Sequence, residues 1–426
     1  MSQTMQDANH LRSLTGDITI WRGGRIATMD PHHHAEYGLV EGHDLITSGA
    51  HIVGVYPENS YEVPANAKIY ELAGALVTPG FIDCHTHLVF GGNRAKEWEM
   101  RQNGVPYTQI AAEGGGINST VRATREATFD ALYEKAYPRM LALAQEGVTT
   151  IESKSGYGLN LEDERKQLLV SKKLGEAYPI EIAPTLLSAH AIPPEYMNAD
   201  GTDRGDEYIT LVCDEILPTL WSAGLFEAVD VFCESVGFTL AQTKRVFEAA
   251  TKLHIPVKGH MEQLSNLGGS ELIAQYQGWS VDHIEFLDEP AIKALSESGT
   301  VATLLPLAFY FLRETQKPPI ALLRQYGVPM AVSTDYNPGT SPFTSLRFAM
   351  NAACVFFGLT PEEVMAGVTR NAAKALGREA THGQIKSGFI ANFAIWNVQD
   401  PVEIFYEVGY NPLQQRVYEG NITPLS

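Results

Sequence analysis

The stretch VTPGFIDCHTHLVFGGNR (77–94) reads as a turn, a buried strand and a second turn. Pro79-Gly80 interrupts the chain, and the apolar run that follows ends in His85-Thr86-His87. Residues two apart in a strand point to the same face, so both imidazoles are expected to project together. Two imidazoles supply half of the ligands that a zinc or iron site needs. A lone HxH pair also occurs on the wet face of ordinary strands, so the rest of the chain must supply the other ligands.

From Phe81 onward, short apolar or β-branched runs alternate with amphipathic helical segments. The helical pattern is clearest over 162–176, 208–221, 239–253 and 289–298. The predicted strands end at His87, Ser155, His190, Glu234, His260, His283, Leu307 and Asp335. Eight strand–helix units in roughly 300 residues predict a (β/α)8 barrel, and polar residues gather where barrel enzymes keep their active sites.

The barrel is predicted to interrupt a smaller β-domain. Residues 17–79 hold short alternating segments separated by turns, and residues 378–426 return to a β-type pattern that includes IFYEVG (404–409). The expected fold is α/β, a (β/α)8 TIM barrel with a small β-sandwich domain built from both chain termini. The expected parts are a polar extension (1–16), the first half of the sandwich (17–79), the metal-dependent barrel (80–377) and the second half (378–426).

Composition limits the kinds of partner. The chain has 31 basic and 50 acidic residues, a net charge of −19, and no basic run, so neither nucleic acid nor an anionic membrane is an expected partner. Four widely spaced cysteines without a CxxC pair favour reduced thiols in a cytoplasmic protein. The N-terminus lacks a signal-peptide pattern, and the longest apolar run, 301–312, is too short to span a bilayer. His32–His34 is expected to lie in a solvated turn.

Four residues at predicted strand ends form the candidate metal site. His85 and His87 end the first strand, His260 the fifth and Asp335 the eighth. Three nitrogens and one carboxylate oxygen suit zinc or iron and leave room for a water molecule. If only one such residue were present, the simpler interpretation would be a polar side chain that makes hydrogen bonds within the barrel and binds no metal. Four of them at strand ends of one barrel make a metal site the better one.

Other residues are candidates for proton transfer and substrate binding. His190 ends the third strand and His283 lies in the sixth; either could transfer a proton or polarise a carbonyl, although a buried histidine bonded to backbone fits His283 equally well. Arg94 follows two glycines and could grip a carboxylate. The loop 335–340 runs toward an expected helix start at Ser341-Pro342, so its amides are a candidate anion cradle.

These residues lie in longer stretches that resemble the imidazolonepropionase family of the amidohydrolase superfamily. The matching stretches cover nearly the whole chain and read TPGFIDCHTH, FGGNR, IESKSGYGL, LSAHAIPPE, GHMEQLSNLGG and STDYNPGTSP. GHMEQLSNLGG and KSGYGL are specific to the resemblance, whereas HxH is shared across the superfamily.

The resemblance implies ring opening of 4-imidazolone-5-propanoate by water, giving N-formimidoyl-L-glutamate in histidine degradation, and a homodimer. It implies metal binding by His85, His87, His260 and Asp335, and substrate contacts at Arg94, Tyr157, His190, Gln263, Asn337, Gly339 and Thr340. Some relatives carry glutamate at the position of Gln263. A general-base role proposed for that glutamate therefore cannot be assigned to Gln263 in this chain. His283, His190 and Asp335 remain the candidates for proton work.

The number of metal ions also follows from the resemblance. Two-metal amidohydrolases bridge their ions with a carboxylated lysine on the fourth strand, where this chain has Glu234. Lys154 ends the second strand and is misplaced for that role. A single zinc or iron ion is therefore expected.

Two other functions share much of the same pattern. A deaminase of a purine-like or pyrimidine-like ring would use the same ligands but needs no carboxylate clamp, so Arg94 favours the ring-opening hydrolase. A barrel that only binds a ligand is the second alternative, and the complete ligand set argues against it.

Overall fold

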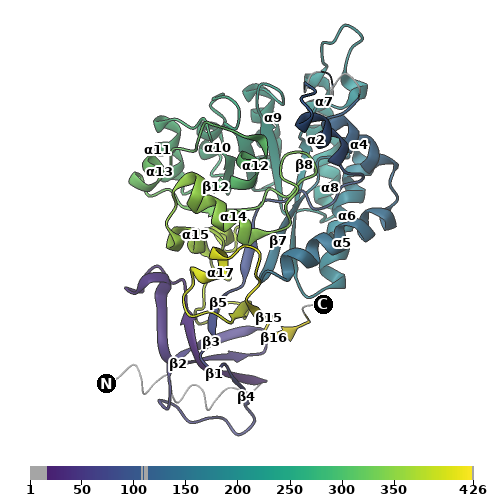
Figure 1. The fold of residues 1–426 in the computed structure, drawn as a ribbon. Coiled ribbons are helices and arrows are strands. Elements are labelled where there is room, and N and C mark those ends of the chain that lie inside the picture. The colour runs from purple at the N-terminus through teal and green to yellow at the C-terminus, as the bar shows by residue number, and fades with distance from the viewer. Residues whose placement is uncertain (1–16, 107–108, 110–113, 425–426) are drawn as a thin grey trace.

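The computed structural model describes residues 17–106, 109 and 114–424. The expected extension at 1–16 lies outside the described residues. Eight parallel strands form one sheet in strict chain order, which confirms the predicted barrel (Figure 1). They are β6 (Phe81–Asp83), β7 (Val148–Lys154), β8 (Glu181–Ala189), β9 (Ala228–Cys233), β10 (Val257–Met261), β11 (Ser280–His283), β12 (Val301–Leu304) and β13 (Met330–Val332).

Contacts between the first and last strands bring the two ends of this sheet together. The His87 amide donates to the Tyr336 carbonyl at 2.8 Å, and the His85 amide donates to the Ser333 hydroxyl at 2.8 Å. A parallel bridge between Thr86 and Tyr336 lies at the same level. The segments that carry His85, His87 and Asp335 therefore lie side by side, although about 250 residues separate them in the sequence.

Helices surround the strands, and several begin at a residue whose side chain caps the helix. Thr239 forms a capping box with Gln242, and Asn160 and Asp288 accept bonds from the third residue beyond. The α-helices of the barrel are α2 (Ala95–Gln102), α4 (Ile117–Glu126), α5 (Phe129–Ala144), α6 (Leu161–Ala177), α7 (Gly205–Leu211), α8 (Leu217–Ser222), α9 (Leu240–Lys252), α10 (Gly269–Gln275), α11 (Glu289–Ser298), α12 (Pro306–Leu312), α13 (Ile320–Gln325), α14 (Leu346–Ala352), α15 (Pro361–Gly367) and α16 (Arg370–Ala375). Two π-helical turns (Val212–Ile216 and Ala353–Phe357) and a 3-10 turn (Pro194–Tyr196) join some of them.

Three local predictions were wrong. The seventh strand stops at Leu304 rather than Leu307, because Pro306 has no amide hydrogen for the sheet and starts α12 instead. The helix expected at Ser341-Pro342 begins at Leu346, because Ser341 donates its hydroxyl to the Thr334 carbonyl while Ser345 provides the cap. The segment IFYEVG contains the helix α17 (Glu403–Tyr406) instead of a strand, and its Ile404 and Phe405 are buried.

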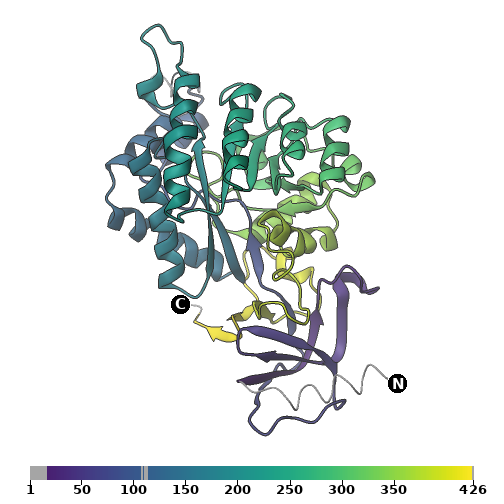
Figure 2. The same ribbon diagram turned by 180° about the vertical axis from the view of Figure 1, so that it is seen from behind.

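Strands from both chain ends form a second, mixed sheet beside the barrel, as Figures 1 and 2 show from opposite sides. β5 joins the two ends, because it pairs with β1 in parallel and with β14 antiparallel. Alternating side chains bury one apolar cluster around Trp21 and another around Ile20, on the two faces of the sheet. The strands are β1 (Ile18–Ala27), β2 (Leu39–Ser48), β3 (His51–Pro57), β4 (Lys68–Glu71), β5 (Leu76–Pro79), β14 (Phe393–Trp396), β15 (Leu413–Tyr418) and β16 (Asn421–Thr423), with a 3-10 turn at Glu36–Gly38.

We propose the domain boundaries 79/80 and 377/378. β5 ends at Pro79 and β6 begins at Phe81, and α16 ends at Ala375. The two parts pack together closely, because Trp396 of the mixed sheet stacks on Phe81 with ring centroids 5.2 Å apart.

No helix among the described residues is long and apolar enough to cross a membrane. All four cysteines are free, and His32–His34 lies in an exposed turn.

A part-buried ion-pair cluster holds the tail segment against the barrel and predicts a pH dependence of stability. Glu181 at the start of β8 accepts from Arg378 at 2.9 Å and lies 3.2 Å from His382 Nε2. Burial alone would raise the pKa of Glu181, but His382 and Arg378 outweigh it and lower the pKa from 4.5 to about 2. The ionised Glu181 therefore stabilises the folded protein fully at pH values above its pKa in the unfolded chain. This stabilisation is lost as the pH falls toward the folded-state pKa of about 2.

Glu181→Gln should therefore reduce the loss of stability between neutral pH and about pH 3, because glutamine does not titrate. Urea unfolding at the two pH values measures the difference. Glu176→Gln is the matched control, since Glu176 is 64% exposed and its contact with Lys173 spans 3.5 Å, so its pH dependence should equal that of the native chain. An equal pH dependence in the Glu181 variant would contradict the assignment.

Candidate metal centre and substrate site

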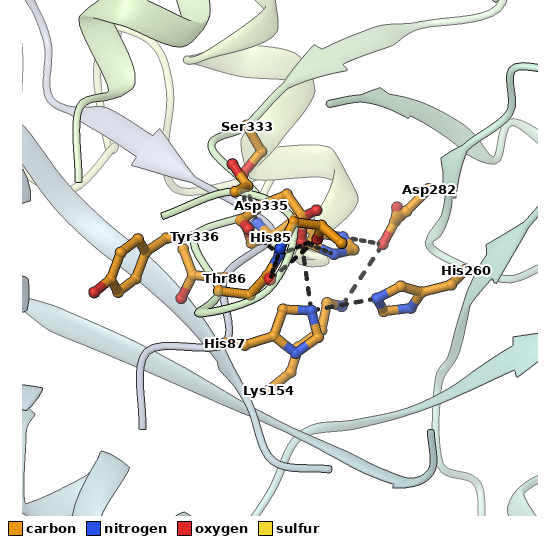
Figure 3. Close-up of polar contacts among 12 residues, drawn as sticks. His85, Thr86, His87, Lys154, His260, Asp282, Ser333, Asp335 and Tyr336 are labelled. Carbon is orange, nitrogen blue, oxygen red and sulfur yellow. Dashed lines mark hydrogen bonds and ion pairs between the residues drawn. The ribbon is translucent and has the colours of Figure 1, made fainter. Parts of the chain in front are cut away.

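The four predicted metal ligands meet at the carboxyl ends of the barrel strands (Figure 3). His85 and His87 follow β6, His260 lies in β10, and Asp335 follows β13. Asp335 Oδ1 lies 3.3 Å from His85 Nε2 and 3.5 Å from His87 Nε2. The Nε2 atoms of His87 and His260 are 3.4 Å apart. All four residues are buried.

This spacing fits a metal ion. Ligand atoms at about 2.0–2.1 Å from a tetrahedral ion lie about 3.3–3.4 Å from one another, close to the three distances between the His and Asp atoms. The Nε2 atoms of His87 and His260 face each other, an arrangement in which two lone pairs repel unless a proton or a cation lies between them. The ligand atoms of His85, His87 and His260 all lie within 4.8 Å of one another. The donor set therefore matches zinc or iron.

Two carboxylates fix the orientation of two of these rings. His85 donates from Nδ1 to Asp282 Oδ2 at 2.7 Å, and His260 donates from Nδ1 to Asp230 Oδ1 at 3.1 Å. A proton on Nδ1 leaves the lone pair of Nε2 directed at the site.

The sequence analysis missed a buried charge network directly beneath these ligands. Lys154 lies within 4 Å of Glu152, Asp230 and Asp282, and all four side chains are fully buried. Asp230 and Asp282 are the carboxylates that hold the histidines. The available signal was the alternation in the barrel strands, where every second residue points inward, so Glu152 and Lys154 share the inner face. The three carboxylates outweigh the burial of Lys154 and raise its pKa, which keeps it an ammonium rather than a carboxylated bridge.

His190 lies against the metal ligands, as its position at a strand end suggested. Its ring stacks on His87, with centroids 5.2 Å apart and an interplanar angle of 17°. Its Nδ1 donates to the Gly156 carbonyl at 3.0 Å, so Nε2 carries the lone pair. Burial, with the nearby His87 and His260, lowers the pKa of His190 well below its ordinary value. His190 is therefore a neutral ring next to the site.

His283 also faces the site, in a strained backbone conformation. Its ring centroid is 5.5 Å from that of His260 and 5.8 Å from that of His85. Its Nδ1 is buried without a hydrogen-bond partner, and burial lowers the pKa of the ring to about 3. His283 and Ile284 have φ angles of 81° and 67°, which non-glycine residues rarely adopt. The extended strand conformation therefore ends at His283.

Tyr157 is held over the metal ligands by a rigid loop. Its ring centroid lies 5.8 Å from that of His87. The Gly156 and Gly158 amides donate to the buried carboxylate of Glu164 in α6, and the Tyr157 amide donates to Gln167 Oε1 at 3.1 Å. Two side chains of one helix thus explain why the KSGYGL stretch presents Tyr157 to the site.

Arg94 lines a cavity of about 390 Å³ beside the loop that follows β13. Its Nε donates to Glu97 Oε2 at 2.9 Å. A Cβ at Gly339 would collide with Arg94 Nη1, so only glycine lets the guanidinium lie against the loop after β13. The structure therefore brings Arg94 to the loop that contains Asn337, Gly339 and Thr340. The cavity is lined by Phe90, Asn93, Arg94, Ala95, Glu97, Trp98, Arg101, Arg139, Phe311, Tyr336, Pro338, Gly339 and Pro342.

The expected cradle of exposed amides in this loop was wrong. The amides of Gly339 and Thr340 both donate to Asn337 Oδ1 at 2.8 Å, because the asparagine side chain closes an Asx turn. The Asn337 side chain donates in turn to the Asp335 carbonyl at 2.8 Å. The loop is therefore internally bonded and offers side chains, not free amides, to an anion.

Gln263 lies two residues beyond the end of β10 and is half-buried. Glu234, which ends the fourth strand region, holds the same loop, because its Oε1 accepts from the amides of Leu264 at 2.8 Å and Ser265 at 3.1 Å. The Glu234 carboxylate thus binds the backbone of the loop that carries Gln263.

Comparison with known proteins agrees with this site. The model of the amidohydrolase family matches residues 232–422. An imidazolonepropionase of Klebsiella pneumoniae subsp. pneumoniae is 60% identical over 409 residues, which is 96% of this chain and 99% of the relative. The chain belongs to the imidazolonepropionase family. An imidazolonepropionase of Photorhabdus laumondii subsp. laumondii is 59% identical, over 95% of this chain and 96% of the relative. The resemblance seen in the sequence stretches is confirmed.

Solved structures show that this imidazolonepropionase-family chain has the amidohydrolase fold. An adenosine deaminase from Xanthomonas campestris with bound zinc superposes with a TM-score of 0.67 at 17% identity, covering 96% of this chain and 92% of the deaminase. An N-isopropylammelide isopropylaminohydrolase from Burkholderia multivorans gives 0.66 at 16% identity, with 95% and 98% covered. At these identities the likeness concerns the fold alone.

Proposed function

We propose that this chain hydrolyses 4-imidazolone-5-propanoate to N-formimidoyl-L-glutamate, a step of histidine degradation. The observation that carries the proposal is the full-length similarity to relatives named imidazolonepropionase. The buried cluster of three histidines and one aspartate is consistent with it. Incubation of the purified protein with this substrate, followed by mass analysis, tests the proposal. The product should be heavier than the substrate by one water, whereas release of ammonia would favour a ring deaminase.

We assign one zinc or iron ion to His85, His87, His260 and Asp335. When bound, such an ion makes its water more acidic and polarises a carbonyl oxygen. The nearby imidazoles of His85 and His87 outweigh burial and hold the pKa of Asp335 well below its ordinary value. Its carboxylate is therefore available to receive a proton.

In the proposed reaction, water adds to the ring carbonyl carbon, and the bond from that carbon to the ring nitrogen breaks. The carboxylate oxygen of Asp335 takes a proton from the water and returns it to the departing nitrogen. His190 Nε2 carries a lone pair, so it accepts a hydrogen bond from a ring N–H. Neutral His283, whose ring centroid lies 5.5 Å from that of His260, is the second candidate for proton transfer. Arg94 binds a carboxylate, and Tyr157, Gln263, Asn337 and Thr340 complete the proposed substrate contacts. Gly339 contributes by leaving room for the Arg94 guanidinium.

One metal ion per chain is the expected content of the purified protein. The ligand atoms of His85, His87 and His260 lie within 4.8 Å of one another, and Asp335 Oδ1 lies 3.3 Å from His85 Nε2. Lys154 is ion-paired with three carboxylates, so it is not available to bridge a second ion. Elemental analysis after removal of loosely bound metal measures the ratio and distinguishes zinc from iron. Two equally occupied ions per chain would contradict this assignment.

Arg94→Met should weaken binding of the carboxylate substrate about 10- to 100-fold, because a charge-assisted hydrogen bond contributes roughly 1.5–3 kcal/mol. KM and metal content of the variant measure the effect, and the metal content should not change. A substrate analogue without the propanoate carboxylate should be turned over poorly by the native enzyme and equally by the variant. Lys96→Met is the matched control, since Lys96 is 90% exposed and its ion pair joins it to Glu99.

The family resemblance also suggests a homodimer in the cytoplasm. Four free cysteines and the proposed place in amino-acid degradation support that location. Light scattering of the purified protein tests the assembly, and fractionation of the source cells tests the location.

A further inference from the structure

Lys154 connects the supports of two metal ligands that come from different strands. Its Nζ lies 2.6 Å from Asp230 Oδ2 and 3.6 Å from Asp282 Oδ2. Asp230 uses its other oxygen to hold His260 Nδ1, and Asp282 uses the oxygen near Lys154 to hold His85 Nδ1. One ammonium group therefore contacts both carboxylates that orient imidazoles. Figure 3 labels Lys154 and Asp282 of this arrangement, with the two imidazoles.

A third carboxylate, that of Glu152, also holds Lys154 in place. Glu152 Oε2 lies 2.9 Å from Lys154 Nζ, and Glu152 Oε1 lies 2.7 Å from Lys258 Nζ and accepts from Thr185 at 2.6 Å. All of these charged side chains are fully buried. Glu152 and Lys154 come from the same strand, so backbone pairing in β7 places them together.

Lys154 is also needed to balance the negative charge of the buried carboxylates. The buried network holds two lysines against the carboxylates of Glu152, Asp230 and Asp282. Without Lys154, Asp230 and Asp282 would have no ion pair with a lysine or arginine among the described residues. A buried carboxylate that loses its cation turns toward other donors, and this change frees the imidazole that it holds.

We propose that Lys154 is a positioning residue for the metal centre, which keeps Asp230 and Asp282 in the orientation that aims His260 and His85 at the ion. The inference rests on the metal site of the proposed function but not on the identity of the substrate. Lys154 touches neither the substrate nor the metal in this account, and acts only through the two carboxylates.

A simpler effect of a nearby positive charge would have the opposite sign. An ammonium group close to a cation site repels the cation, so removal of Lys154 would then tighten metal binding. A positioning role predicts weaker binding, by about 10- to 100-fold, the effect typical of residues that support metal ligands. The direction of the change in metal affinity therefore separates the two effects.

The experiment compares Lys154→Met with Lys258→Met. Lys258 is equally buried and belongs to the same network, but its contacts are Glu152 and the Cys84 carbonyl, and it forms no ion pair with Asp230 or Asp282. Each metal-free variant is titrated with Zn²⁺ in competition with a chelator. Co²⁺ is added in parallel, because its visible absorption reports the geometry of the ligands. Circular dichroism and thermal unfolding establish that each metal-free protein is folded.

Lys154→Met should bind Zn²⁺ about 10- to 100-fold more weakly than the native protein and show an altered Co²⁺ spectrum. Lys258→Met should keep both the affinity, within a few-fold, and the spectrum. If Lys154→Met does not fold, Lys154→Gln, which keeps a hydrogen-bond donor without the charge, takes its place with the same expectation at the lower end of the range. Unchanged or tighter binding in a folded Lys154 variant would overturn the proposal, and so would equal weakening by Lys258→Met.

The same titration separates this inference from the proposed function. A native protein that binds Zn²⁺ tightly, with a Lys154 variant that binds equally well, would refute only the positioning role. A native protein that binds neither ion would refute the metal site on which both proposals rest. Hydrolysis of a different ring by the native enzyme would leave the role of Lys154 intact.

Discussion

Replacing Asp335 by asparagine is expected to lower kcat by a factor of about 100 to 10,000, the range typical for loss of a positioned acid or base. Asparagine has nearly the same volume and keeps a ligand oxygen, but it cannot take up a proton. Asp335 lies 3.3 Å from His85 Nε2 and 3.5 Å from His87 Nε2, so its oxygen is positioned both to bind metal and to receive the proton.

Metal content must be measured beside the rate, since asparagine is also a weaker ligand than a carboxylate. The expected result is a large fall in kcat per bound metal ion. Ser341→Ala, in the same loop, is a suitable control, because Ser341 bonds the Thr334 carbonyl and lies outside the ligand set. Turnover near the native rate in a metal-loaded Asp335 variant would remove this carboxylate from the proton-transfer steps.

His260→Ala is expected to empty the site and abolish measurable turnover. The substitution removes one of four ligands and leaves the carboxylate of Asp230 without the imidazole that it holds at 3.1 Å. Loss of a direct ligand should weaken metal binding by more than the roughly 10- to 100-fold that loss of a supporting residue causes. Chelator competition and elemental analysis measure both the affinity and the content.

His190→Ala is the matched control for this prediction. His190 is a neighbouring imidazole that stacks on His87 but binds the Gly156 carbonyl with Nδ1 and does not belong to the proposed ligand set. It should lose rate and keep metal. Full metal content in the His260 variant would mean that β10 does not supply a ligand.

Much of the architecture could be predicted, because it depends on local patterns. The barrel follows from the repeated strand–helix period, and the ligands follow from polar residues at strand ends, where parallel strands of one barrel must converge. His85, His87, His260 and Asp335 were found in this way and do converge. One error lies where a polar contact overrides a local signal: Ser341 bonds the Thr334 carbonyl and leaves the cap to Ser345.

The sequence by itself thus determined the order of the strands, the family and the residue types that can bind a metal, because these depend on periodicity and on motifs within short stretches. Only the tertiary structure decided how the ligands are supported. Lys154, Asp230 and Asp282 come from three different strands, and nothing in their spacing along the chain shows that one ammonium group contacts both carboxylates. Such a network forms only when barrel closure buries the inward-facing side chains together, where a low local dielectric makes each unpaired charge costly.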